Sequence, residues 1–155
     1  MHVLYTLMKR GKKNILSTKP KTTQNLARKL AKNPPSRIFA LVGDLGSGKT
    51  TFTQAFLRAL GVRGKITSPT FLIFKSYNLK SKIYKTAYHI DCYRLNNPEE
   101  LLSLGLKKIL ADPKNIILIE WADRIKKTLP KKGVFWVDFA YGNQENERVL
   151  TTSLS

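Results

Sequence analysis

Apolar residues occur along the chain in two patterns, unbroken runs and helical repeats, and together these patterns predict an α/β fold. Residues 38–42 and 116–119 are continuous apolar runs, which are typical of parallel strands buried on both faces. Residues 51–60 instead carry apolar side chains at helical spacing, and Gly61 follows as a helix end. Buried strands alternating with helices indicate a mixed parallel and antiparallel sheet flanked by helices.

Cap residues and β-rich segments predict the remaining elements. Thr22 or Thr23 is expected to cap a helix that ends before Pro34, and Asn97 followed by Pro98 and two acids predicts the start of another helix. A short helix is expected around residues 123–129. The other expected strands are residues 13–18 at an edge, 71–79 and 83–91 as an antiparallel hairpin, and 134–140 and 148–153 as closing strands.

The first apolar run leads directly into the sequence of a phosphate-binding loop. The pattern G-x-x-x-x-G-K-[ST] is met by Gly43, Asp44, Leu45, Gly46, Ser47, Gly48, Lys49 and Thr50. Glycines let backbone N–H groups approach phosphate oxygens, and a helix N-terminus attracts negative charge. Lys49 is expected to reach the β- and γ-phosphates, and the Thr50 hydroxyl to ligate Mg²⁺. The chain is therefore expected to be a P-loop NTPase-like domain that binds a nucleoside triphosphate.

Two acids at the ends of predicted strands are the candidate catalytic residues. Glu120 ends the second apolar run, where P-loop proteins place an acid near Mg²⁺ and the attacking water. Asp91 ends the hairpin. The sequence leaves open which acid binds the metal; Glu120 is favoured as the metal ligand and Asp91 for catalysis. A surface salt bridge is the ordinary alternative for Glu120.

The length and the cysteine content of the chain indicate how many domains it forms and where in the cell it is expected. With 155 residues the chain is expected to form one domain, residues 13–155, preceded by a basic tail of residues 1–12. No stretch approaches the length of a transmembrane helix, and basic residues follow the apolar start rather than precede it, unlike in a signal peptide. The single Cys92 excludes an internal disulfide and fits a cytoplasmic location.

Positive charge is the unusual feature of the composition. The chain has 28 Lys and Arg against 10 Asp and Glu, a formal net charge of +18. Such a charge attracts phosphate-rich partners such as RNA, but a solvated lysine-rich surface explains it equally well. The cations are spread along the chain and match no RNA-binding module, so charge alone does not name a partner.

Four short stretches, in their order and spacing, resemble the bacterial TsaE (YjeE) ATPases of tRNA threonylcarbamoyladenosine synthesis. The stretches are residues 43–52, Ser68-Pro69-Thr70-Phe71, residues 89–95 (His-Ile-Asp-Cys-Tyr-Arg-Leu) and Ile119-Glu120-Trp121. The resemblance covers the chain from about residue 13 onward. It implies a weak, Mg²⁺-dependent ATPase that works with the TsaD–TsaB complex, where ATP hydrolysis resets the complex between turnovers. Contact with tRNA is expected through these partners, and a direct contact stays open.

Further site residues are expected from the motifs and from the resemblance. Ser68 or Thr70 lies where a switch segment contacts the γ-phosphate or Mg²⁺. By resemblance, Asp91 is the acid of the family motif, Trp121 acts near the nucleotide or the partner, and Arg148 with the loop 17–23 approaches the base. His89 is expected to be structural, because no second histidine lies nearby for a metal site. The expected nucleotide-contacting set is residues 43–50 with Thr51, Thr70, Trp121 and Arg148.

Three other functions compete with this interpretation. A GTPase switch needs a guanine-reading Asn-Lys-x-Asp, which the sequence lacks, so adenine is favoured. A small-molecule kinase usually needs an arginine-bearing lid, and the region after Asp91 offers only Arg94 before acids and leucines. A basic RNA-binding protein with a secondary P-loop is the third alternative.

Overall fold

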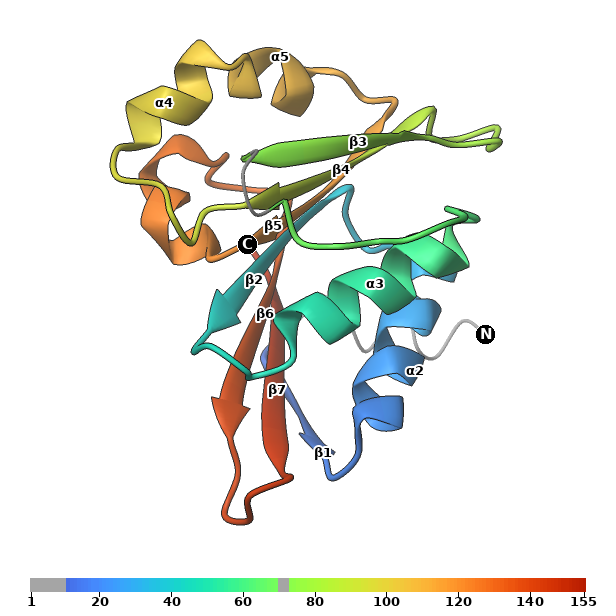
Figure 1. Ribbon diagram of the computed structural model, residues 1–155, viewed down its shortest axis with the longest axis vertical. Helices are drawn as coiled ribbons and strands as arrows, with labels where there is room; N and C mark the ends of the chain where they lie inside the picture. Colours follow the sequence, from blue (N-terminus) through green and yellow to red (C-terminus); the bar gives the residue numbers. More distant parts are fainter. Residues whose placement is uncertain (1–10, 70–72) are drawn as a thin grey trace.

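The computed structural model of the chain describes residues 11–69 and 73–155. Within these ranges, a seven-stranded sheet with the order β1-β7-β6-β2-β5-β4-β3 carries helices on both faces (Figure 1). The strands are β1 (Lys13–Ser17), β2 (Ile38–Gly43), β3 (Phe74–Asn78), β4 (Thr86–Asp91), β5 (Asn115–Glu120), β6 (Val134–Tyr141) and β7 (Arg148–Leu154).

The sheet is mixed, as the sequence predicted. Strands β4, β5, β2 and β6 are parallel to one another. At the two sides, β3 pairs antiparallel with β4, β7 pairs antiparallel with β6, and β1 pairs antiparallel with β7. All six residues of β5 are buried, and the apolar run 116–119 that predicted a strand buried on both faces forms its middle. Because parallel strands end at the same edge, the C-terminal ends of β2, β4 and β5 lie together.

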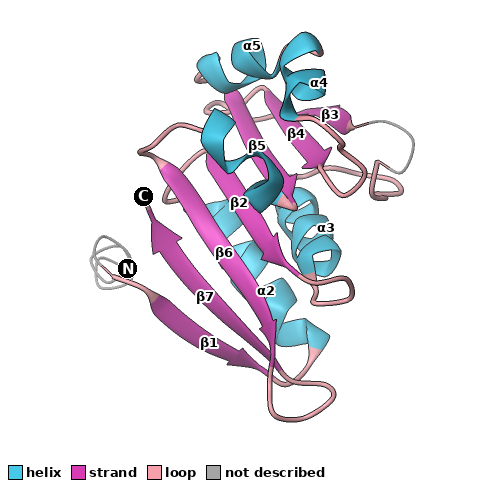
Figure 2. Cartoon of the chain, turned by 90° about the vertical axis from the view of Figure 1, so that its left-hand side faces the viewer, coloured by secondary structure: helices cyan, strands magenta, loops and turns pink. Residues whose placement is uncertain are grey.

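Two helical layers cover the sheet. On one face α2 (Pro20–Lys32) packs on α3 (Lys49–Ala59), and Figure 2 shows this pair behind the sheet. The other layer contains α4 (Pro98–Ser103), α5 (Leu106–Ala111) and the 3₁₀ segment η1 (Ala122–Thr128). Alternate residues of β2 enter the two cores, with Phe39 and Leu41 facing α2 and α3 and Ile38 and Ala40 facing the opposite layer.

Most element boundaries follow the sequence prediction, with one clear error. The first helix begins at Pro20, so the prediction of a cap at Thr22 or Thr23 is wrong. Proline suits the first helical turn because its fixed φ is helical and its missing N–H needs no partner there. Thr23 instead points inward, where its hydroxyl lies 3.0 Å from that of Ser17. By contrast, Asn97 caps α4 as predicted, in a capping box with Glu100.

No helix in the described ranges combines the length and the apolar character that a membrane span requires.

Candidate functional site

The loop that joins β2 to α3, residues 43–50, is called here the glycine loop. Its backbone has φ of +145° at Gly43, +74° at Gly46 and +108° at Gly48, values that side-chain-bearing residues rarely adopt. At Gly43 there is also no room, because a Cβ there would lie 2.4 Å from the backbone oxygen of Phe139 on β6. The shape of the loop is thus set by glycines at fixed positions and by the neighbouring strand.

Lys49 lies inside this loop rather than on the surface. Its side chain is 4% exposed, and Nζ donates to the carbonyl oxygens of Gly43 at 2.6 Å and Asp44 at 2.7 Å. The Trp121 ring covers it, with Nζ 4.0 Å from the ring centroid. Burial lowers the pKa of Lys49, and the nearby Glu120 carboxylate opposes that shift. The loop therefore holds a desolvated ammonium group whose hydrogen bonds go to carbonyl oxygens of the loop itself.

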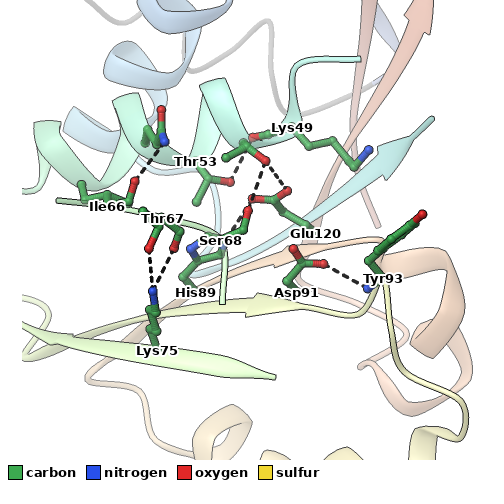
Figure 3. Close-up of polar contacts among 12 residues, drawn as sticks. Lys49, Thr53, Ile66, Thr67, Ser68, Lys75, His89, Asp91, Tyr93 and Glu120 are labelled. Carbon is green, nitrogen blue, oxygen red and sulfur yellow. Dashed lines mark hydrogen bonds and ion pairs between the residues drawn. The ribbon is translucent and has the colours of Figure 1, made fainter. Parts of the chain in front are cut away.

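Glu120 links the glycine loop to the hairpin strand β4. The Thr50 hydroxyl donates to Glu120 Oε2 at 2.9 Å, and His89 Nε2 lies 2.8 Å from Glu120 Oε1 (Figure 3). An ionised carboxylate only accepts, so Nε2 is the donor. Both His89 and Glu120 are almost fully buried, and in the described part of the chain no other His, Lys or Arg nitrogen lies within 4.0 Å of a carboxylate oxygen. The orientation of the Glu120 carboxylate is therefore fixed from both sides.

Asp91 lies beside Glu120 because the two residues are partners in the parallel β4–β5 ladder. Its carboxylate accepts from the backbone N–H of Tyr93 at 3.0 Å, so its hydrogen bond goes to the following loop rather than to Thr50. Burial raises the pKa of Asp91, and the negative charge of Glu120 adds to that rise. The two acids thus share one end of the sheet but have different partners.

Two cavities flank the glycine loop. The larger, about 680 Å³, is lined by Lys49, Thr50, Ser68, Asp91, Glu120 and Trp121 together with loop and hairpin residues. The smaller, about 220 Å³, lies between the loop and Ser17, Lys19, Pro20, Thr23 and Arg148, and Thr51 also lines it. The structure therefore brings together every expected site residue except Thr70, which lies outside the described residues. Ser68, in the same expected switch segment, has its hydroxyl 3.5 Å from that of Thr50.

Comparisons with known proteins identify the family. The family described as "Threonylcarbamoyl adenosine biosynthesis protein TsaE" matches residues 17–150. The chain belongs to the TsaE family. It is 36% identical to the tRNA threonylcarbamoyladenosine biosynthesis protein TsaE of Bacillus subtilis, covering 85% of this chain and 80% of that one. It is 41% identical to the TsaE of Rickettsia bellii, in a match that covers 70% of this chain and 73% of that one.

A solved structure agrees with this membership. The crystal structure of Bacillus subtilis YdiB superposes with a TM-score of 0.72 at 31% identity, covering 94% of this chain and 87% of that one. The resemblance and the fold class predicted from the sequence are confirmed, and the chain takes the role of the TsaE family in tRNA threonylcarbamoyladenosine biosynthesis.

The site of this TsaE chain suits a polyphosphate with a hard divalent cation. The oxygens of Thr50, Ser68, Asp91 and Glu120 are the donor type that Mg²⁺ prefers. Among the described residues there is no cluster of three or more His, Cys, Asp or Glu that would hold a metal alone. That donor set fits Mg²⁺, which is commonly bound by one or two carboxylates together with the phosphates of a substrate.

Sequence reasoning missed Tyr141 and, at His89, the contact with Glu120. His89 was expected to be structural, and it is fully buried, lines neither cavity and orients Glu120. Side chains alternate along β4, so residues 89 and 91 share a face, and that alternation is the signal that places both near Glu120. Tyr141 is cross-strand partner to Arg148, and its hydroxyl donates to the Leu45 carbonyl at 2.5 Å. No sequence signal pointed to Tyr141.

Proposed function

We propose that this TsaE-family protein binds ATP with Mg²⁺ at the glycine loop and hydrolyses it in support of the TsaD–TsaB complex. That complex places the threonylcarbamoyl group on the tRNA adenosine beside the anticodon. The observation that carries the proposal is the hydrogen bond between Thr50 and Glu120. It joins the residue that ends the phosphate-binding motif to the acid that ends the neighbouring strand, the pair that P-loop proteins use around Mg²⁺.

Each side chain has a role that follows from its position. Lys49 holds its charge within the glycine loop, bonded to the carbonyl oxygens of Gly43 and Asp44, and it would stabilise negative charge on the β- and γ-phosphates. Thr50 and Glu120 would hold Mg²⁺, which when bound neutralises phosphate charge. Asp91 lines the same cavity without bonding Thr50, and it is assigned to orienting the attacking water.

The rest of the nucleotide is assigned to the two sides of the loop. The backbone of residues 43–51 would cradle the phosphates, with Trp121 beside Lys49 on the γ-phosphate side. Thr70, outside the described residues, keeps its expected role at the γ-phosphate. The smaller cavity beside Arg148 takes the base and ribose, because Arg148 and residues 17–23 converge there. ATP is favoured over GTP because the chain has no Asn-Lys-x-Asp for guanine.

The test is Mg²⁺-dependent nucleotide hydrolysis by the full chain, alone and with its cognate TsaD and TsaB. We expect slow ATP turnover that rises with the partners and exceeds GTP turnover. Lys49→Ala should reduce turnover by on the order of 10²-fold or more, since a preorganised charge at the phosphates is lost. Lys65→Ala, which removes an exposed cation beyond α3, serves as the matched control and should retain turnover.

Two results would contradict the proposal. Wild-type turnover by Lys49→Ala would remove the glycine loop from the reaction. Turnover that prefers GTP, or that the partners leave unchanged, would keep the loop as a nucleotide site but separate it from the TsaD–TsaB complex.

A further inference from the structure

The two signs of charge are distributed differently along the chain. Cations occur throughout the sequence, but nine of the ten acids lie at or after Asp91, and Asp44 is the single acid before it. Both α2 and α3 lie in the part of the sequence before Asp91. The helical layer that they form on one face of the sheet therefore carries cations and no acid.

Helix α2 carries the densest part of this layer. Lys21, Arg28, Lys29 and Lys32 are all exposed, and they lie on one side of the helix, opposite the buried Ala27 and its neighbours. Positions 21 and 32 are about 16 Å apart along the helix axis at 1.5 Å per residue. The helix contains no acid, so its outer face carries positive charge only, and its four exposed cations are called here the α2 stripe.

The α2 stripe is not neutralised by the rest of the described protein. Arg28 bonds only to neutral oxygens, those of Asn25 at 2.9 Å and Gln24 at 3.4 Å. Across residues 11–69 and 73–155, no lysine or arginine lies within 4.0 Å of a carboxylate in an ion pair. The opposite layer differs, because α4 begins with Glu99 and Glu100 and η1 contains Asp123.

We propose that the α2 stripe binds the phosphate backbone of folded tRNA. Unpaired lysines and arginines in a row attract a polyanion and gain free energy by releasing its counterions. The outer face of α2 has no aromatic residue on which unpaired bases would stack, so it suits the backbone of a stem rather than a single strand. The tRNA pathway of the TsaE family supplies a folded RNA.

Two features argue against nucleotide binding and membrane binding by the α2 stripe. Its four cations line neither cavity, so they are not part of the nucleotide site. A helix that binds anionic membranes needs an apolar face free to enter the lipid, but the apolar face of α2 is buried in the core against α3.

The test is tRNA binding by the full chain, measured by fluorescence anisotropy over a range of salt concentrations. One variant removes the α2 stripe (Lys21→Gln, Arg28→Gln, Lys29→Gln and Lys32→Gln). A matched control removes four exposed lysines from the opposite layer (Lys107→Gln, Lys108→Gln, Lys126→Gln and Lys127→Gln). Both variants change the net charge by the same amount, and glutamine preserves helix propensity. Their unfolding midpoints and ATP turnover are measured in parallel.

We expect the α2 variant to lose about three units of the slope of log K against log salt, since each phosphate contact contributes about 0.7–0.9. Its affinity near 0.1 M salt should fall by about tenfold or more, and the control should fall by less than about twofold. Equal losses in both variants or undetectable tRNA binding would each overturn the proposal. ATP turnover is read separately, so failure here leaves the proposed ATPase untouched, and the reverse also holds.

Discussion

The two sides of the larger cavity are built in different ways. On one side, the glycine loop takes its shape from backbone torsions and from the close approach of β6 at Gly43. On the other side, Asp91 and Glu120 stand at strand ends, and Glu120 is oriented by side chains from two distant segments, His89 and Thr50. One side is therefore built from backbone torsions that glycines allow, whereas the other is built from side chains that meet only after the sheet has formed.

This difference determines how each side should respond to substitution. A backbone-built loop tolerates no Cβ where its torsions or contacts need glycine, so damage there should be large and should affect folding and binding together. A side-chain-built acid pair can lose one hydrogen bond and keep its strand position, so damage should be graded and confined to turnover. The predictions below test this contrast.

The largest expected effect is from Gly43→Ala. The new Cβ would meet the Phe139 carbonyl oxygen, and φ of +145° disfavours any side chain. Strain and overpacking together should lower the free energy of unfolding by about 3 kcal/mol or more, measured by urea denaturation. Gly61→Ala is the matched control, with φ of +91° and open space around the Cβ, and should cost only about 1–2 kcal/mol. Equal costs would show that torsion alone shapes the loop.

The next effect in size is from Glu120→Gln. The amide keeps the shape of the side chain but removes the charge expected to hold Mg²⁺. Mg²⁺-dependent turnover should fall by on the order of 10²-fold, while ATP binding without Mg²⁺ should change little. Asp123→Asn removes an exposed acid from the neighbouring η1 segment and should leave turnover within about twofold. Loss of both binding and turnover in Glu120→Gln would instead indicate a folding role.

The sequence predicted the parts of this protein that are encoded over short spans. The glycine loop, the buried strands and the cap at Asn97 each depend on a few neighbouring residues, so their patterns were sufficient. The bond between His89 and Glu120 joins residues 31 positions apart, and only strand order decides that they meet. Pro20 shows the reverse case, because a local proline signal outweighed the threonines expected to cap α2.

A smaller effect is expected from removing the His89 donor. His89→Leu leaves one oxygen of the buried Glu120 carboxylate without its charge-assisted hydrogen bond. Losing that bond removes about 1–2 kcal/mol of the interaction energy that orients the carboxylate. Turnover at saturating ATP and Mg²⁺ should fall by about tenfold if the lost bond loosens the carboxylate in the transition state. His89→Gln retains a donor and should recover part of that loss. If Leu and Gln behave alike, the histidine acts through packing and the carboxylate is oriented by Thr50 alone.

The smallest expected effect returns to the glycine loop and is from Tyr141→Phe. The Tyr141 hydroxyl and the Arg148 guanidinium bind the carbonyl oxygens of Leu45 and Gly46, and a trans peptide directs its N–H away from its carbonyl. Holding the Leu45 oxygen in this way directs the N–H of Gly46 to the opposite side of its peptide, where phosphate is expected, whereas the N–H of Ser47 donates to the Asp44 carbonyl at 3.2 Å. Because Tyr141 is half exposed, loss of its hydroxyl should cost only about 0.5–1 kcal/mol. The Kd for ATP should rise about two- to fivefold with kcat unchanged, measured against Tyr88→Phe as control. A fall in kcat instead would mean that the loop tip acts on the transition state, and the two sides of the cavity would then differ less than their construction implies.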